Sequence, residues 1–106
     1  MVLSLLEKRQ RDRDYRYFKN LKDLYNISKD EYYSFLNEQN NTCANKFCRK
    51  KPGDYGRETR LHIDHNHKTG KVRGLLCANC NHTLGKVKDD KLILMGLIDY
   101  LNERNK

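Results

Sequence analysis

The stretch HIDHNHKTGKVRGLLCANCN, residues 62–81, places three histidines, one aspartate, two cysteines and three asparagines within twenty positions. Side chains of these types bind metal ions or move protons when they gather in one place. Three interpretations are open at this point: one metal site, two metal sites of different chemistry, or a polar loop beside a disulfide. The remainder of the sequence distinguishes them.

The cysteines form two pairs. Two residues separate Cys77 from Cys80, four separate Cys43 from Cys48, and 28 residues lie between the pairs. These spacings suit a closed tetrahedral zinc site, in which the metal is structural because no ligand position stays open. Disulfides require an oxidising compartment, and the apolar patch of MVLSLLEKRQ is too short for a secretory signal. We therefore predict a four-cysteine zinc site coupled to folding, in preference to disulfides or free thiols.

Composition limits the class of protein. The chain has 106 residues, of which 37% are hydrophobic, and its mean hydropathy is −1.01. One small domain spanning residues 1–106 would have a weak core, so a metal or a homodimer would help to stabilise it. No apolar run approaches the roughly 20 residues of a transmembrane helix, so we expect no membrane-spanning segment.

The positive charge is concentrated in the middle of the chain. The net charge is +8, and residues 43–91 alone hold 12 basic and 5 acidic side chains. Concentrated positive charge around a candidate site indicates an anionic partner, most commonly nucleic acid. The charged run KRQRDRD at residues 8–14 alternates in sign, and we interpret it as a solvated helix face in preference to a DNA contact.

The N-terminal region, residues 1–42, is predicted to be helical. A first helix is expected over residues 8–25, with its apolar stripe formed by Tyr17, Phe18, Leu21, Leu24 and Tyr25. Ser28 and Glu31 form a capping-box pattern that predicts a second helix, ending near residues 40–42, and Ile27 could pack against Tyr32 at its start.

Residues 43–90 are predicted to hold two short strands and a helix. The strands are expected over residues 59–64 and 71–76, with a turn at 67–70 between them. A helical turn begins at Cys77 and is expected to break at Gly85. The last helix is expected over residues 89–104, and the C-terminal region is residues 91–106. This helix is too apolar for one narrow stripe, so either the domain buries it or part of it meets a partner chain. The fold class is therefore small, mostly helical α+β.

Three polar residues could support phosphodiester hydrolysis with one divalent cation. Asp64 and Asn81 offer oxygen ligands for Mg²⁺ or Mn²⁺, and His65 could take a proton from water. Neighbouring strand residues face opposite sides, so Asp64 and His65 can meet one phosphate only if the strand ends or bulges there. Plainer interpretations are a turn aspartate, a surface histidine and a helix cap. His67 could support catalysis or could belong to the turn.

Basic residues near this cluster could bind DNA. Arg73 is either a phosphate-binding guanidinium or an ordinary strand arginine, and Lys68 and Lys71 flank the same turn. We interpret His62 and His82 as packed or solvent-exposed side chains without a role in the reaction.

The string CANKFC…LHIDHNHKTGKVRGLLCANCNHTLG resembles the recombination endonuclease VII family, within the wider HNH (His-Me finger, ββα-metal) nucleases. The match is close over residues 43–85, and residues 21–43 and LIDYLNE also look like elements that accompany this core. The resemblance implies that a hairpin and helix at residues 60–90 form the active site. It also implies one structural zinc per chain, Asp64 and Asn81 as metal ligands, His65 as general base, and His67 as a supporting residue.

The resemblance further implies a DNA endonuclease with a catalytic Mg²⁺ or Mn²⁺ that acts on double-stranded DNA. The namesake of the family cuts branched DNA as an intertwined dimer, so branched and nicked duplexes are candidate substrates, but the matched residues speak to cleavage and not to the shape of the DNA. We accordingly expect a homodimer, and a phage or prophage protein in the cytoplasm of a bacterial host. Two departures bear on this expectation: four residues, instead of two, separate the first cysteines, and we see no separate C-terminal DNA-recognition region. The alternatives are a non-catalytic zinc-stabilised nucleic-acid-binding module and a protein-interaction module that uses the last helix.

Overall fold

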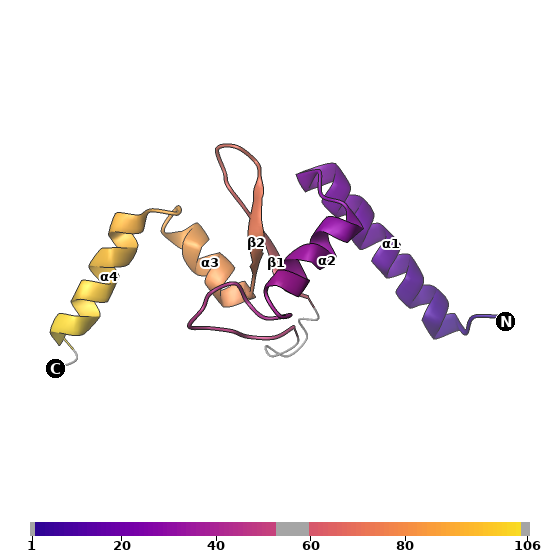
Figure 1. Ribbon diagram of the computed structural model, residues 1–106, viewed down its shortest axis with the longest axis horizontal. Helices are drawn as coiled ribbons and strands as arrows, with labels where there is room; N and C mark the ends of the chain where they lie inside the picture. Colours follow the sequence, from indigo (N-terminus) through magenta and orange to yellow (C-terminus); the bar gives the residue numbers. More distant parts are fainter. Residues whose placement is uncertain (1, 53–59, 105–106) are drawn as a thin grey trace. The chain divides into compact units, whose positions relative to one another are not determined.

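The computed structural model describes residues 2–52 and 60–104, and four helices and a two-stranded sheet follow one another as α1, α2, β1, β2, α3 and α4 (Figure 1). The predicted α+β class is confirmed. The residues divide into two compact units, Met1–Asn41 with Ile63–Leu75, and Thr42–His62 with Leu76–Lys106. Each unit is described by itself below, and the predicted single domain stays a prediction.

The helix α1 spans Leu5–Tyr25 and begins three residues before the predicted range. Its start is set by Ser4, whose hydroxyl accepts a hydrogen bond from the backbone N–H of Glu7, while the Glu7 carboxylate accepts from the backbone of Ser4. Leu21 is buried, but Leu24 is 74% exposed. The predicted apolar stripe was therefore wrong at Leu24, which lies away from the packed face.

The helix α2 spans Lys29–Glu38 and carries the predicted capping box between Ser28 and Glu31. Ile27 and Tyr32 are 1% and 2% exposed, as a hydrophobic pair at a helix start would be. The Phe18 ring of α1 packs edge-on against Tyr32, with 5.4 Å between ring centroids. An aromatic contact of this kind joins the two N-terminal helices.

A β hairpin follows, with β1 at His62–His65 and β2 at Val72–Leu76. The predicted start of the first strand at residue 59 lies outside the described residues, and β1 runs one residue beyond its predicted end. The Asn66 side-chain carbonyl accepts hydrogen bonds from the backbone N–H groups of Lys68 and Thr69, and Gly70 has a φ of 77°. Asparagine and a left-handed glycine together close the predicted turn.

One side chain ties α2 to the hairpin within the first unit. The Gln39 amide donates to the Leu75 carbonyl and its oxygen accepts from the Leu75 N–H, both at 2.9 Å. Gln39 thereby pairs with β2 as a neighbouring strand would, and Leu75 is 0% exposed.

The helix α3 spans Ala78–Lys86 in the second unit, with Cys77 as its N-cap. The prediction that Gly85 would interrupt this helix was wrong, because Gly85 lies inside it. An exposed glycine costs a helix about 1 kcal/mol relative to alanine but removes no hydrogen bond. The helix ends after Lys86, and Lys88 and Asp89 adopt left-handed conformations with φ of 52° and 58°.

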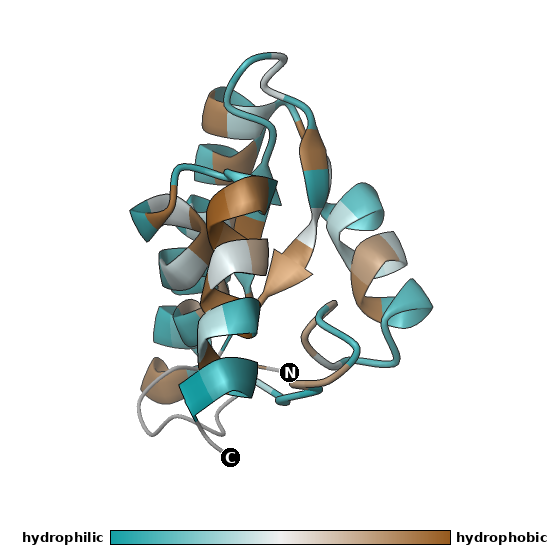
Figure 2. Cartoon of the chain, turned by 90° about the vertical axis from the view of Figure 1, so that its left-hand side faces the viewer, coloured by the Kyte–Doolittle hydropathy of each residue, from teal (hydrophilic) through white to brown (hydrophobic). Residues whose placement is uncertain are grey.

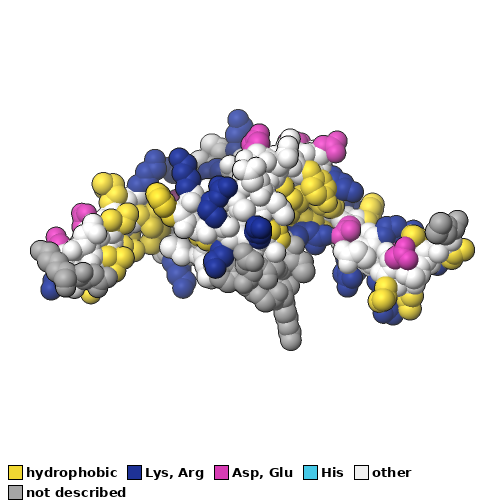
Figure 3. All heavy atoms as spheres, turned by 60° about the horizontal axis from the view of Figure 1, so that its bottom comes forward, with side chains coloured by type: hydrophobic (Ala, Val, Ile, Leu, Met, Phe, Trp, Pro, Cys, Tyr) yellow, Lys and Arg dark blue, Asp and Glu magenta, His cyan; other side chains and the backbone are white. Residues whose placement is uncertain are grey.

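The helix α4 spans Lys91–Arg104 and begins two residues later than predicted. Asp90 is the residue that sets its start, since Asp90 Oδ1 accepts from the N–H groups of Leu92 and Ile93. No residue of α4 is buried, so the first of the two expectations, that the domain buries this helix, was wrong. In Figure 2 turns of α4 carry the hydrophobic colour, and Figure 3 shows hydrophobic side chains on the visible face of this helix. The large apolar side chains of α4 that are exposed are Leu92, Ile93, Met95, Leu97, Ile98, Tyr100 and Leu101. Among the described helices, none combines the length and apolar character needed to cross a membrane.

Candidate functional site

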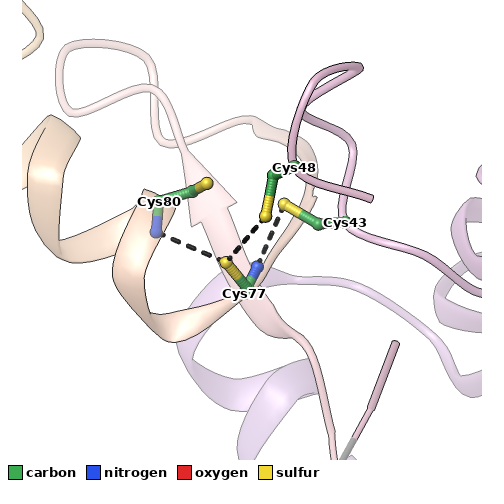
Figure 4. Close-up of side chains that lie close together, drawn as sticks. All are labelled: Cys43, Cys48, Cys77 and Cys80. Atoms are coloured by element: carbon green, nitrogen blue, oxygen red, sulfur yellow. Dashed lines mark hydrogen bonds between the residues drawn. The ribbon is translucent and has the colours of Figure 1, made fainter. Parts of the chain in front are cut away.

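The four cysteines meet in the second unit (Figure 4). Their sulfur atoms all lie within 4.8 Å of one another, and 3.6 Å separates Cys48 Sγ from Cys77 Sγ. A disulfide needs a separation of about 2.05 Å, so all four are free thiols in this structure. Tetrahedral zinc with bonds of about 2.3 Å would hold its sulfurs about 3.8 Å apart, and the cluster fits that arrangement.

The first cysteine pair closes through a turn at Asn45. The Asn45 carbonyl accepts from the N–H groups of Cys48 and Arg49, and Arg49 is left-handed with a φ of 54°. The Cys43 N–H donates to the Lys50 carbonyl at 2.7 Å. The four intervening residues therefore fold into a loop that turns both thiols toward the same point, which answers how the wider spacing can serve one ion.

Hydrogen bonds from N–H groups support the sulfurs. The Cys77 N–H donates to Cys43 Sγ at 3.3 Å, the Cys80 N–H to Cys77 Sγ at 3.5 Å, and the Asn45 side chain to Cys80 Sγ at 3.4 Å. Such donors stabilise thiolates and orient them for a metal. Cys77 has two roles, since the same sulfur that belongs to the cluster also caps α3.

Burial and hydrogen bonding shift the thiol pKa values in opposite directions. Burial raises the pKa of the Cys43 thiol, and it raises the pKa of Cys80 to about 12. Burial also acts to raise the pKa of Cys77, but hydrogen bonds from the Cys80 backbone and the neighbouring thiols outweigh it, so the Cys77 pKa is lowered. A bound cation would overcome the cost of burial by stabilising all four thiolates together.

In the first unit, Asp64 of β1 is paired with Arg73 of β2. The guanidinium donates from Nε to Asp64 Oδ2 at 2.9 Å and from Nη2 to Oδ1 at 2.8 Å. The Asp64 side chain is 12% exposed and that of Arg73 36%. The sequence left Arg73 open between a phosphate-binding residue and an ordinary strand arginine, and in the structure its guanidinium binds the proposed metal ligand Asp64. Each carboxylate oxygen keeps a lone pair, so Asp64 still has the donor chemistry of a cation ligand.

His65 is the last residue of β1, and its ring contacts two other aromatic rings. Its ring centroid is 4.7 Å from that of His67 and 5.2 Å from that of Tyr25, the last residue of α1. The structure thus brings the rings of His65 and His67 together, while the Asp64 side chain is paired with Arg73. Tyr25 was missed from the sequence, where it counted only as part of an apolar stripe.

Lys68 and Lys71 lie on the turn of the hairpin and are exposed. Lys71 also lines a cavity of about 510 Å³ together with Thr69, Gly70 and residues of the α1–α2 corner, among them Tyr25 and Phe35. Basic side chains beside aromatic ones are typical of surfaces that bind nucleic-acid strands.

Asn81 belongs to the second unit and lies one turn into α3, where its backbone N–H donates to the Cys77 carbonyl at 3.0 Å. It is therefore not a helix cap, because Cys77 fills that position. The cysteine cluster determines where the helix that carries Asn81 begins. Since Asp64 lies in the other unit, the pairing of Asn81 with Asp64 stays a prediction.

His62 and His82 pack edge to face, with 6.0 Å between their centroids, in agreement with a packing role.

The four cysteine sulfurs lie close enough together to hold one metal ion. The chain belongs to the recombination endonuclease VII family, which matches residues 18–103. That range contains all four cysteines and each of the proposed site residues.

Two relatives are phage proteins. The chain is 40% identical over 80 residues to the Gene 59 protein of Mycobacterium phage D29, and 41% identical over 78 residues to the Gene 59 protein of Mycobacterium phage L5. These alignments cover 74% and 73% of this chain but 46% and 44% of the relatives, so the chain spans about half the length of the proteins it matches. No solved structure matches the chain significantly.

Proposed function

We propose that the protein is a divalent-metal-dependent DNA endonuclease of the HNH type, built on a ββα-metal core that comprises β1, β2 and α3. The observation that carries this proposal is the position of His65, which ends β1 next to His67 and one residue after Asp64, within the residues that match the nuclease family. A histidine and a carboxylate at one strand end are what a water-activating site needs.

In this proposal His65 takes a proton from a water molecule whose oxygen attacks the phosphorus, and the bond from phosphorus to the 3′ oxygen breaks, leaving a 5′-phosphate end. Asp64 and Asn81 would hold Mg²⁺ or Mn²⁺. When bound, the cation would neutralise the charge that develops on the leaving oxygen. His67 supports the His65 ring, and Lys68, Lys71 and Arg73 bind backbone phosphates.

The cysteine cluster would hold one structural zinc ion, with Cys43, Cys48, Cys77 and Cys80 as its ligands. Its four ligands leave no position for water, so it takes no part in the reaction. It stabilises the loop at 43–50 and the start of α3 instead.

The test is a cleavage assay with zinc-loaded protein, plasmid DNA and Mg²⁺ or Mn²⁺. His65→Ala should lower the cleavage rate by at least about 10²-fold, the contribution of a general base. His82→Ala is the matched control, because His82 is exposed and has no role in the mechanism. A cleavage rate that is the same in His65→Ala as in wild type would refute the mechanism. A panel of linear, nicked, mismatched and four-way-junction DNA, with a chelator control, identifies the substrate.

The second candidate is a zinc-stabilised module that binds nucleic acid without cutting it. It accounts for the basic residues and the cysteine cluster, but not for Asp64, His65 and Asn81. It predicts that Asp64→Ala binds DNA as tightly as wild type or more tightly, because a carboxylate repels phosphate unless a cation bridges the two groups. It also predicts that divalent cations do not change the DNA affinity of either protein. The endonuclease proposal predicts that Mg²⁺ changes DNA affinity in the wild type and no longer does so in Asp64→Ala.

We also propose that α4 contacts a second copy of the chain, because its large apolar side chains are exposed along the helix. Sedimentation of wild-type protein should give a homodimer, and Leu97→Ser combined with Ile98→Ser should shift it to monomer. Since both relatives are phage proteins, we further propose that this protein acts in the cytoplasm of a bacterial host.

A further inference from the structure

Tyr25 lies outside the hairpin, yet it contacts the residue on which the proposed reaction depends. It is the last residue of α1, and its ring lies 5.2 Å from that of His65 with an angle of 47° between the ring planes. This distance and tilt are those of a favourable aromatic contact. The N-terminal helix therefore reaches the candidate base directly.

The backbone on both sides of Tyr25 is fixed. Leu21, one turn earlier, is 5% exposed, and Ile27, two residues later, is 1% exposed. Between them Asn26 ends the helix in a left-handed conformation, with a φ of 53°, and its N–H donates to the Lys22 carbonyl at 3.0 Å. Buried anchors before and after Tyr25 hold its backbone in place, next to the end of β1 that carries His65.

The His65 imidazole makes no hydrogen bond within residues 2–52 and 60–104. The rings that contact it there are those of Tyr25 and His67. A histidine base is ordinarily oriented by a partner that accepts a hydrogen bond from its second nitrogen. In this structure, contacts with the rings of Tyr25 and His67 stand where such a hydrogen-bond acceptor would be.

We propose that Tyr25 is a positioning residue that holds the His65 ring in its reactive orientation, so that α1 is part of the catalytic apparatus. This inference rests on the proposed role of His65 as general base. The Tyr25 hydroxyl makes no hydrogen bond within the described part of the chain, so the aromatic ring carries the effect. Phenylalanine should therefore replace Tyr25, and leucine should not.

The experiment compares zinc-loaded full-length wild type, Tyr25→Phe, Tyr25→Leu and the control Tyr15→Leu. Tyr15 lies on the same helix and is 69% exposed. Tyr25→Leu should lower kcat by about 10- to 100-fold with KM within about 3-fold, because a small displacement of a reacting group has effects of this size. Tyr25→Phe and Tyr15→Leu should stay within about 2-fold of wild type.

The second measurement is the set of NMR contacts between ring protons in DNA-free protein. Wild type and Tyr25→Phe should show contacts from residue 25 to His65 and from His65 to His67, and Tyr25→Leu should lose the latter. Absence of the wild-type contact between rings 25 and 65 overturns the proposal even if the leucine variant does not fold. Wild-type kcat in Tyr25→Leu, or a loss in Tyr25→Phe equal to that in Tyr25→Leu, overturns it too. If the wild type does not cut DNA, the proposed function fails while the ring contacts still test the packing.

Discussion

Asp64 and Arg73 form a two-pronged ion pair on adjacent strands of the hairpin, with both carboxylate oxygens accepting hydrogen bonds from the guanidinium at 2.9 and 2.8 Å. Asp64 is 9% exposed, and a carboxylate so buried requires a compensating positive charge. Arg73 supplies this charge in the structure. In the proposed enzyme, a divalent cation would compete with Arg73 for the same oxygens and leave the guanidinium for phosphate.

Arg73→Gln should lower the free energy of unfolding by about 1–2 kcal/mol, less than for a fully buried pair because the Arg73 side chain is 36% exposed. Mn²⁺ should then raise the melting temperature of Arg73→Gln more than that of wild type, since the carboxylate has lost its competing partner. Thermal unfolding with and without Mn²⁺ measures both effects. Arg16→Gln, an exposed arginine of α1, is the control; equal responses to Mn²⁺ in wild type and Arg73→Gln would contradict the prediction.

The two roles of Cys77 can be separated by two substitutions. Cys77→Ser and Cys77→Ala should each abolish zinc binding, since three thiolates remain, and each should lower stability by several kcal/mol. Serine is a good N-cap and alanine is not, so Cys77→Ala should be the less stable of the two by about 1 kcal/mol. Zinc content and chemical denaturation give the comparison, with Cys48→Ser as a variant that removes a ligand and keeps the cap. Retention of one tightly bound zinc by Cys77→Ala would contradict a four-thiolate site.

Zinc uptake should release protons. The pKa of Cys80, raised to about 12 by burial, and the raised pKa of Cys43 keep both thiols protonated at neutral pH before the metal binds. Each must lose its proton to bind zinc, so zinc affinity should fall as pH falls and rise as pH rises. Calorimetry in buffers of different ionisation enthalpy should count at least two protons released per zinc at pH 7. Proton release near zero would show that the thiols are already ionised.

The salt dependence of DNA binding tests the role of the hairpin turn. Lys71→Gln should weaken binding by a similar factor for every DNA sequence, and it should make the plot of log affinity against log salt shallower by about 0.9, the contribution of one phosphate contact. His65→Ala serves as the background for titrations, so that DNA stays intact. The control is Lys19→Gln, which changes an exposed lysine on α1 and should leave the slope unchanged. If Lys71→Gln also leaves the slope unchanged, Lys71 does not contact a DNA phosphate.

Local patterns in the sequence determined much of the structure. The capping box of Ser28 and Glu31 depends on residues three apart, and the turn at Asn66–Gly70 depends on side-chain bonds within the turn itself. The cysteine spacings likewise indicated the cluster, because short spacings limit where two thiols can point. Such features can be predicted from the sequence because the interacting residues lie only a few positions apart.

Tertiary structure decided the contacts between residues distant in sequence. Gln39 pairs with Leu75, 36 residues away, Tyr25 reaches His65, and Arg73 turns toward Asp64 instead of outward to a phosphate. No local sequence pattern predicts these three contacts. Each depends on how the N-terminal helices and the two strands pack, because packing decides which side chains become neighbours. The sequence by itself determined the cysteine cluster and named the residues of the proposed site. Folding decided which rings contact His65 and which side chain neutralises Asp64, since a buried charge is costly to leave unpaired.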